Sequence, residues 1–325
     1  MPTVTTTTSD VPISPLVVAV VGPTATGKSA LAVALALALD GEIVNADASA
    51  LYRGMDIGTA KPTLAERRGI PHHQLDVLEV TQEASVAAYQ QDARADVEAI
   101  LARGRLPILA GGSGLYVRAA LDHLDIPPTD PAVRARLEAE ATVDPDGPSH
   151  LRARLAQLDP VAAQRIEPNN VRRIVRALEV IELTGQPFSA TMPERRHLLP
   201  TVMIGLTLDR ASLDARIEAR TRAMWDAGLV AEVEGLLDRG LAQGRTARTA
   251  LGYAQAIDQL RGALTQTEAI EATAAATRRF ARRQESWFRP DPRIIWLPAE
   301  APDLLGRAQE AVKAASQTSA MPENG

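Results

Sequence analysis

The sequence feature that most constrains this chain is a glycine-rich loop between an apolar run and a helix-forming run. Residues 16–21 are apolar, residues 22–29 are Gly-Pro-Thr-Ala-Thr-Gly-Lys-Ser, and residues 30–39 are typical of a helix. A strand, the pattern G-x-x-x-x-G-K-S and a helix in this order indicate a phosphate-binding P-loop. In such a loop, backbone N–H groups and the lysine face phosphate oxygens, and the serine hydroxyl can bind Mg²⁺. We therefore predict a diphosphate or triphosphate site at Gly22, Pro23, Thr24, Ala25, Thr26, Gly27, Lys28 and Ser29, with Ser29 as the metal ligand.

The composition limits the classes of protein to which the chain can belong. With 325 residues, 46% of them hydrophobic, it is long enough for one large domain or two smaller ones. No apolar run approaches the roughly 20 residues that span a membrane, and residues 1–10 lack the features of a secretory signal. The absence of cysteine excludes disulfides and thiolate catalysis, and it fits a cytoplasmic protein. Because the net charge is −5, a nucleic acid partner would require a local basic patch.

Short β-type runs alternate with helical stretches, which predicts an α/β fold. The runs are 16–21, 42–47, 106–110, 201–208 and 293–297, with 74–78 as a further candidate. The stretch from 127 to 199 has helical segments, no strand and many arginines. We therefore predict a P-loop NTPase-like parallel sheet flanked by helices, with an all-helical insertion domain. The predicted boundaries are 14–126 and 200–316 for the core, 127–199 for the insertion, and 1–13 and 317–325 for disordered tails.

A carboxylate follows the second β-type run. Asp47 ends that run, and ligands of doubly wound sheets bind outside the carboxyl ends of the strands, so we expect Asp47 beside the P-loop. The run 106–110 leads into Gly-Gly-Ser and carries no Walker-B acid of the kind that hydrolytic P-loop enzymes use to organise Mg²⁺ and water. This pattern favours a transferase that holds a phosphate chain as a leaving group.

Two groups of arginines have alternative interpretations. Arg216 and Arg220 are four residues apart and share a helix face, which is either solvated or a clamp for a diphosphate. Residues 278–289 contain five arginines and one glutamate, interleaved with aromatic residues. They form either the exposed side of a core helix or a surface for phosphate backbones.

Several blocks, in one order, resemble the bacterial tRNA dimethylallyltransferases. They extend from about residue 16 to 298, and the most specific is Tyr-Arg-Gly-Met-Asp-Ile-Gly-Thr-Ala-Lys-Pro at 52–62. The others are the P-loop with Asp47, Gly111-Gly112-Ser113-Gly114-Leu115-Tyr116, Asp130-Pro131 with Val133-Arg134, Arg176-Ala177-Leu178-Glu179-Val180, Gly252-Tyr253 with Gln255, and Arg282-Arg283-Gln284 with Trp287-Phe288-Arg289.

The resemblance implies transfer of a dimethylallyl group from dimethylallyl diphosphate to N6 of the adenine beside the anticodon (A37) of tRNA, with pyrophosphate released. It implies Mg²⁺ as cofactor and an insertion that binds the anticodon stem-loop. It assigns catalysis to Asp47, Thr24 and Arg216, and Arg220 joins the diphosphate site. We expect a cytoplasmic monomer without a membrane partner. The tRNA-binding positions implied are Asp47, Ala48, Ser49, Ala50, Ser113, Arg134, Arg172, Arg173, Ile174, Val175, Arg176, Arg282 and Arg283.

Three other functions use the same motifs. An adenylate isopentenyltransferase shares the P-loop and the aspartate but does not need an arginine-rich insertion. A small-molecule kinase would bind ATP in the loop, and a non-catalytic nucleotide-gated protein would use it to control RNA binding.

Overall fold

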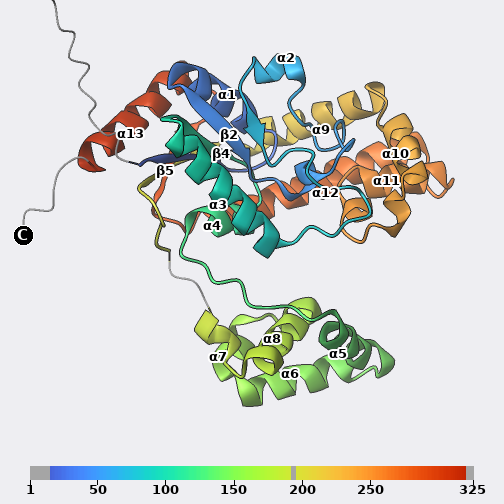
Figure 1. Ribbon diagram of the computed structural model, residues 1–325. Helices are drawn as coiled ribbons and strands as arrows, with labels where there is room; N and C mark the ends of the chain where they lie inside the picture. The colour runs from blue at the N-terminus through green and yellow to red at the C-terminus, as the bar shows by residue number, and fades with distance from the viewer. Residues whose placement is uncertain (1–14, 192–194, 320–325) are drawn as a thin grey trace, which may run out of the picture. The chain divides into compact units, whose positions relative to one another are not determined.

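The computed structural model describes residues 15–191 and 195–319, and it is built around one six-stranded parallel sheet (Figure 1). The strand order is β3-β2-β4-β1-β5-β6, which confirms the predicted α/β fold. The strands are β1 (Val17–Val21), β2 (Gly41–Asn45), β3 (His72–His73), β4 (Leu106–Ala110), β5 (Thr201–Thr207) and β6 (Ile294–Pro298).

The register of the sheet places three loops at the same edge. Val18 of β1 is level with Ile108 of β4, and Val44 of β2 is level with Leu109 of β4. Because all three strands are parallel, the segments that follow them leave the sheet side by side. These segments are the P-loop after β1, the Asp47 turn after β2 and the loop 111–113 after β4.

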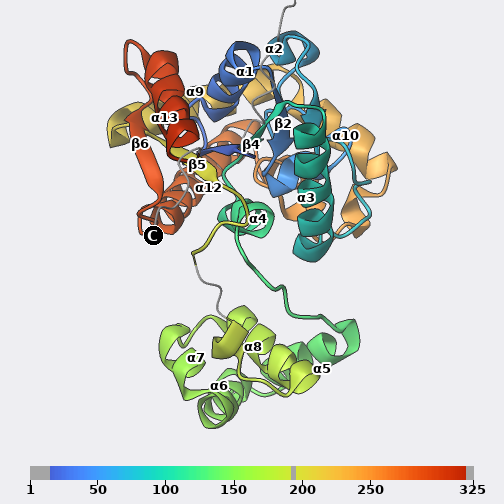
Figure 2. The same ribbon diagram turned by 60° about the vertical axis from the view of Figure 1, so that its left-hand side comes forward.

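Helices cover both faces of the sheet (Figures 1 and 2). α1 and α13 pack on each other and on the strands, and buried residues such as Leu35, Ile204 and Val312 join them to the sheet. α3 and α4 pack together against the opposite side, and α12 contacts α4. The helices of this unit are α1 (Lys28–Ala38), α2 (Leu64–Arg67), α3 (Val86–Ala102), α4 (Gly114–Leu121), α9 (Arg210–Asp226), α10 (Leu229–Asp238), α11 (Tyr253–Leu260), α12 (Gln266–Phe288) and α13 (Leu304–Ser319), with the short 3₁₀ helices η1 (Ala48–Leu51), η3 (Leu241–Gln243) and η4 (Ala247–Thr249).

Residues 122–196 form a separate compact unit, hereafter the helical unit. Its predicted position was 127–199. It contains α5 (Pro131–Val143), α6 (Gly147–Leu158), α7 (Pro160–Arg165), α8 (Val171–Thr184) and η2 (Phe188–Thr191). The four α-helices close around their own apolar core, which includes Leu137, Leu155, Ile174 and Leu178. The remainder of the chain, hereafter the catalytic unit, has separate cores.

The structure corrects two local predictions. Residues 74–78 do not form a strand, because the edge strand β3 ends at His73 and the backbone then turns through positive φ angles at Gln74 and Asp76. α13 extends to Ser319, so the tail predicted from residue 317 overlaps its last turn. The tail predicted at 1–13 lies outside the described residues. Within 15–191 and 195–319, no helix is both long enough and apolar enough to cross a bilayer.

Candidate active site

The P-loop turns through positive φ angles at Gly22, Ala25 and Gly27. Gly22 has φ +128°, and a Cβ there would lie 2.7 Å from the carbonyl oxygen of Leu206 on the neighbouring strand. Gly27 has φ +91° and caps the N-terminus of α1. Inside the turn, the Pro23 carbonyl accepts hydrogen bonds from Thr26 Oγ1 at 2.8 Å and from Lys28 Nζ at 2.5 Å. The loop therefore holds the Lys28 ammonium at the start of α1, where the helix end is itself positive.

The Lys28 ammonium is buried, and no ion pair among the described residues balances its charge. Burial of the ammonium lowers the pKa of Lys28 from 10.5 to about 7; the nearby Asp47 carboxylate raises it only in part, and Arg220 lowers it further. No carboxylate among the described residues forms an ion pair with Lys28. A bound diphosphate would supply the missing negative charge.

Hydrogen bonds fix Asp47 at the same edge of the sheet as the P-loop. Its backbone N–H donates to Asn45 Oδ1 and its carbonyl accepts from Asn45 Nδ2, both at 3.0 Å. Its side chain caps η1, with Oδ1 accepting from the N–H of Ser49 at 3.0 Å. One carboxylate oxygen is thus fixed by the backbone, and the residue as a whole lines a cavity.

That cavity, hereafter the reaction cavity, has a volume of about 310 Å³ and opens between the P-loop, η1, α9 and α12. Thr24, Asp47 and Arg220 line it together. Arg220 Nη1 donates to Thr24 Oγ1 at 3.2 Å and Nη2 donates to the Thr59 carbonyl at 3.4 Å. Apolar side chains form other parts of the wall, namely those of Ile217, Met224, Leu251 and Phe280. The cavity is therefore lined by both charged groups and apolar side chains.

The sequence block 52–62 forms a further wall of the cavity. Its buried Lys61 donates to the carbonyl of Tyr52 and to the carboxylates of Asp56 and Asp76. Glu232 on α10 accepts from the N–H of Asp56 at 3.1 Å and from the next N–H along the chain at 2.8 Å. The Lys61 and Glu232 contacts thus fix the loop that presents the Thr59 carbonyl to Arg220.

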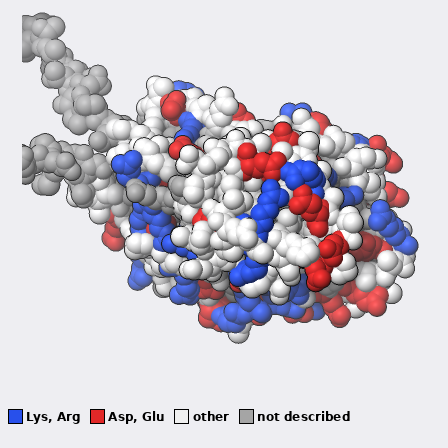
Figure 3. All heavy atoms as spheres, turned by 90° about the horizontal axis from the view of Figure 1, so that it is seen from below, with Lys and Arg blue, Asp and Glu red and all other residues white. Residues whose placement is uncertain are grey.

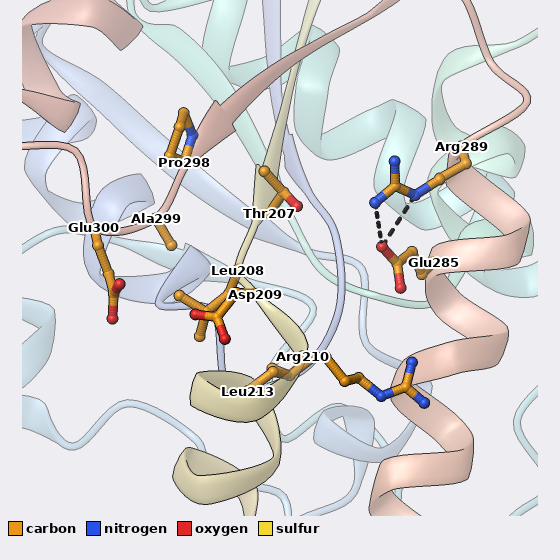
Figure 4. A pocket seen from close by; sticks show the side chains of 10 residues that line it. All are labelled: Thr207, Leu208, Asp209, Arg210, Leu213, Glu285, Arg289, Pro298, Ala299 and Glu300. Atoms are coloured by element: carbon orange, nitrogen blue, oxygen red, sulfur yellow. Dashed lines mark hydrogen bonds and ion pairs between the residues drawn. The ribbon is translucent and has the colours of Figure 1, made fainter.

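A second cavity of about 490 Å³ lies at the carboxyl ends of β5 and β6 (Figure 4). Asp209, Arg210 and Glu300 line it, and on α12 the Arg289 guanidinium faces Glu285 and donates to it at 2.6 Å. None of the residues predicted for catalysis or phosphate binding lines this cavity. The chemistry is therefore assigned to the smaller reaction cavity.

Comparison with known proteins agrees with this geometry. A sequence profile described as IPP transferase matches residues 50–291. The tRNA dimethylallyltransferase of Kineococcus radiotolerans is 61% identical over 309 residues, which are 92% of this chain and 97% of that protein. The chain belongs to the tRNA dimethylallyltransferase family. The protein of that name from Thermobifida fusca is 62% identical over 90% of this chain and 92% of its own length.

Solved structures of the tRNA dimethylallyltransferase family have the same fold. The full-length tRNA isopentenylpyrophosphate transferase of Bacillus halodurans is 38% identical, with a TM-score of 0.69 over 94% of this chain and 98% of its own. A eukaryotic dimethylallyltransferase whose crystal structures show it acting on tRNA is 26% identical, with a TM-score of 0.79 over 96% of this chain and 81% of its own.

One catalytic assignment that the family resemblance implied requires correction. Arg216 is not among the residues that line the reaction cavity; its Nη2 donates to Glu300 at 2.9 Å and its side chain is 43% exposed. Arg220 occupies the place expected of Arg216. One turn of helix separates the two residues by about 6 Å along the axis, so only the residue nearer to Thr24 reaches the P-loop.

The predicted tRNA-binding residues divide into four groups. Ala48, Ser49 and Arg283 line the reaction cavity beside Asp47, while Arg172, Arg173 and Arg282 are exposed. Ser113 Oγ accepts from the N–H of Ala48 at 3.2 Å, and Ala50 is buried, so these two support the Asp47 turn.

The fourth group consists of four predicted residues whose side chains make contacts inside the helical unit. Ile174 and Val175 are buried in the core of the helical unit, because α8 turns this face inward. Arg134 and Arg176 both donate to the fully buried Glu179, at 2.8 and 2.9 Å. These four side chains hold the helical unit together, and spacing alone did not distinguish them from the exposed Arg172 and Arg173.

The sequence analysis assigned no role to Gln284. The residue was noted only as part of the block Arg282-Arg283-Gln284 that resembles the family. The structure buries Gln284 on α12 between the P-loop and the loop 111–113, with hydrogen bonds to both. A single polar residue between arginines and aromatic residues carries no periodic signal, so only the fold could reveal these contacts.

The residues at the P-loop fit a Mg²⁺ ion of the kind that bridges protein and phosphate. Ser29 is in the first turn of α1 with an exposed side chain, and Asp47 lines the neighbouring cavity. Mg²⁺ keeps several waters and binds through one or two protein oxygens plus substrate phosphates. The donor set of one hydroxyl and one carboxylate is therefore sufficient for a substrate-borne ion.

Proposed function

We propose that this protein transfers a dimethylallyl group from dimethylallyl diphosphate to N6 of an adenine next to a tRNA anticodon, and that Asp47, Thr24 and Arg220 carry the chemistry. The observation that supports this most directly is their convergence on one cavity beside the P-loop. The names of the relatives point to the same reaction.

The donor's diphosphate would occupy the P-loop. Lys28 and the N-terminus of α1 face it from one side, and Arg220 approaches from α9 beside Thr24. Positive charge at this place stabilises the pyrophosphate as the C1–O bond breaks, which is where charge develops in the transition state. The apolar wall of Ile217, Met224 and Leu251 suits the five-carbon chain.

The acceptor is a weak nucleophile, because the lone pair of an exocyclic adenine amine is delocalised into the ring. As the bond between N6 and C1 forms, N6 loses a proton, and the Asp47 carboxylate is positioned to accept it. The base has to leave its stack to reach the cavity, as in other enzymes that modify a base. The bound Mg²⁺ would be held by Ser29 and would neutralise the leaving group.

Exposed arginines provide the surface for the RNA. Arg172 and Arg173 project from the start of α8 in the helical unit, and Arg282 is exposed on α12. Their guanidiniums have no ion pair among the described residues, so they remain available for phosphates. We further propose that the protein acts as a monomer on the anticodon stem-loop, and a tRNA substrate would place it in the cytoplasm.

The decisive experiment offers dimethylallyl diphosphate with labelled carbon to three acceptors: an anticodon stem-loop with A37, the same RNA with G37, and free AMP. We expect label only in the A37 RNA, and Asp47→Asn should lower kcat by about 10³-fold while leaving RNA affinity within several-fold. Label in AMP would establish the adenylate transferase instead. Phosphate transfer from ATP to a small molecule, without prenyl transfer, would establish the kinase.

A further inference from the structure

Gln284 connects the P-loop to the turn that carries Asp47. Its Oε1 accepts a hydrogen bond from the backbone N–H of Thr24 at 2.8 Å, and its Nε2 donates to the carbonyl of Gly112 at 3.0 Å. The next residue, Ser113, accepts at Oγ from the N–H of Ala48 at 3.2 Å. A continuous series of contacts thus runs from Thr24 through Gln284 and the loop 111–113 to the residue after Asp47.

The loop after β4 is shaped to admit this side chain. A Cβ on Gly112 would lie 2.0 Å from Gln284 Nε2, and a Cβ on Gly114 would lie 1.9 Å from the Trp287 ring. Both glycines therefore leave room for side chains of α12, one turn apart on the same face. Gln284 is only 4% exposed, so both its hydrogen bonds are made away from water.

We propose that Gln284 is a positioning residue that sets the separation between Thr24 at the donor's diphosphate and Asp47 at the acceptor amine. Its amide does this because it bonds both the P-loop and the loop after β4. The proposal rests on the proposed function for the identity of the two substrates. Gln284 touches neither of them.

The proposal predicts a specific kinetic pattern. Gln284→Leu keeps a comparable volume and removes both hydrogen bonds, so the side-chain link between the P-loop and the loop 111–113 is lost. A misplacement of about 1 Å costs on the order of 100-fold in rate. We expect kcat to fall by about 10- to 100-fold while KM for donor and RNA stays within about 3-fold. Ser286→Ala, an exposed change on the same helix, is the matched control and should leave kcat unchanged.

Gln284→Glu separates the hydrogen bonds from the volume. A carboxylate can accept from Thr24 but cannot donate to Gly112, whereas the protonated acid can do both. The ratio of its kcat to that of the wild type should therefore rise as the pH falls from 8 to 5.5. Lys28, Asp47 and Arg220 carry the charges around this contact from the P-loop, the β2 turn and α9, and they are present in both proteins, so the ratio removes the titration that both share.

A readout that needs no activity completes the test. The Thr24 amide proton should exchange with solvent more slowly in the wild type than in Gln284→Leu, and Gln284→Glu, whose carboxyl group still accepts from Thr24, should keep that protection. A folded Gln284→Leu variant with a protected Thr24 amide or with kcat within 3-fold of wild type would overturn the proposal, as would a loss confined to KM. If the wild type itself transfers no prenyl group, the proposed function fails, and amide protection still decides the contact made by Gln284.

Discussion

The two units of the chain use buried charge in opposite ways. In the helical unit, Glu179 is fully buried, and burial by itself raises the pKa of a carboxyl. Hydrogen bonds from Arg134 and Arg176 outweigh this, so the pKa of Glu179 lies below its usual value. In the catalytic unit, burial lowers the pKa of Lys28 to about 7, and no carboxylate within 15–191 or 195–319 bonds to the ammonium.

The difference separates a structural charge from a functional one. The Arg176 guanidinium also donates to the carbonyls of Pro127 and Pro128, so Glu179 and its arginines hold the entry segment against α8. Arg136 pairs with Glu140 and Glu182 on the surface, and Figure 3 shows acidic and basic side chains side by side on one face of the molecule. A charge already neutralised by its own fold has little left for a ligand. Lys28 donates to a carbonyl but has no acidic partner among the described residues, so its charge is available to a ligand.

The largest expected effect tests which arginine serves the reaction cavity. Arg220→Ala removes the guanidinium beside Thr24, and we expect kcat/KM to fall by about 10³-fold, comparable with loss of a donor to developing charge. Arg216→Ala breaks only an exposed pair with Glu300, so kcat/KM should stay within about 3-fold. Steady-state kinetics of both variants provide the measurement. Equal losses of kcat/KM in the two variants would show that Arg220 is not more important than Arg216 for the reaction.

Stability should respond to the helical unit's buried carboxylate. Glu179→Ala leaves two arginines without their partner, and we expect the free energy of unfolding to fall by about 3 kcal/mol. Glu182→Ala, which breaks a half-exposed pair with Arg136, should cost less than about 1 kcal/mol. Urea denaturation of both variants, followed by circular dichroism, compares them. A cost for Glu179→Ala as small as that for Glu182→Ala would contradict its structural role.

The affinity of the P-loop for pyrophosphate should depend on pH through Lys28. Below pH 7 the ammonium is charged and attracts the anion; above pH 7 the free protein loses this proton, so binding must take one up. The affinity should then fall by about 5-fold from pH 7 to pH 8, relative to Lys28→Arg, which stays charged and reports the ligand's own titration. Titration calorimetry in buffers of different ionisation enthalpy measures both quantities. Parallel profiles in the two proteins would show that Lys28 is charged throughout.

The smallest effect concerns the salt dependence of RNA binding. Replacing Arg172 and Arg173 by glutamine should reduce the slope of log K against log salt by about 1.5, because two phosphate contacts are lost. Arg134→Gln should leave the slope unchanged and lower stability instead, because that guanidinium already binds Glu179. Filter binding at several salt concentrations distinguishes the two. A reduced slope for Arg134→Gln would place it on the RNA surface after all.

Much of the fold was predictable because its signals are local. The apolar runs of β1, β4 and β5 and the glycines that follow β1 and β4 are visible as short patterns, and α5, α7 and α8 of the helical unit begin at Asp-Pro or Asn caps. The edge strand β3 was misplaced, because a two-residue strand has no period to detect. The P-loop and Asp47 could be placed at one edge of the sheet, since ligands of doubly wound sheets bind outside the carboxyl ends of the strands.

By itself, the sequence determined the phosphate loop, the acid at the neighbouring strand end and the family of the chain, because each depends on residue types at fixed short spacings. Only the tertiary structure decided which arginine reaches Thr24, which arginines pair with Glu179, and which two loops Gln284 connects. The physical reason is that a charge or an amide acts through the partner it meets across the fold, and that partner is up to 260 residues away in the chain.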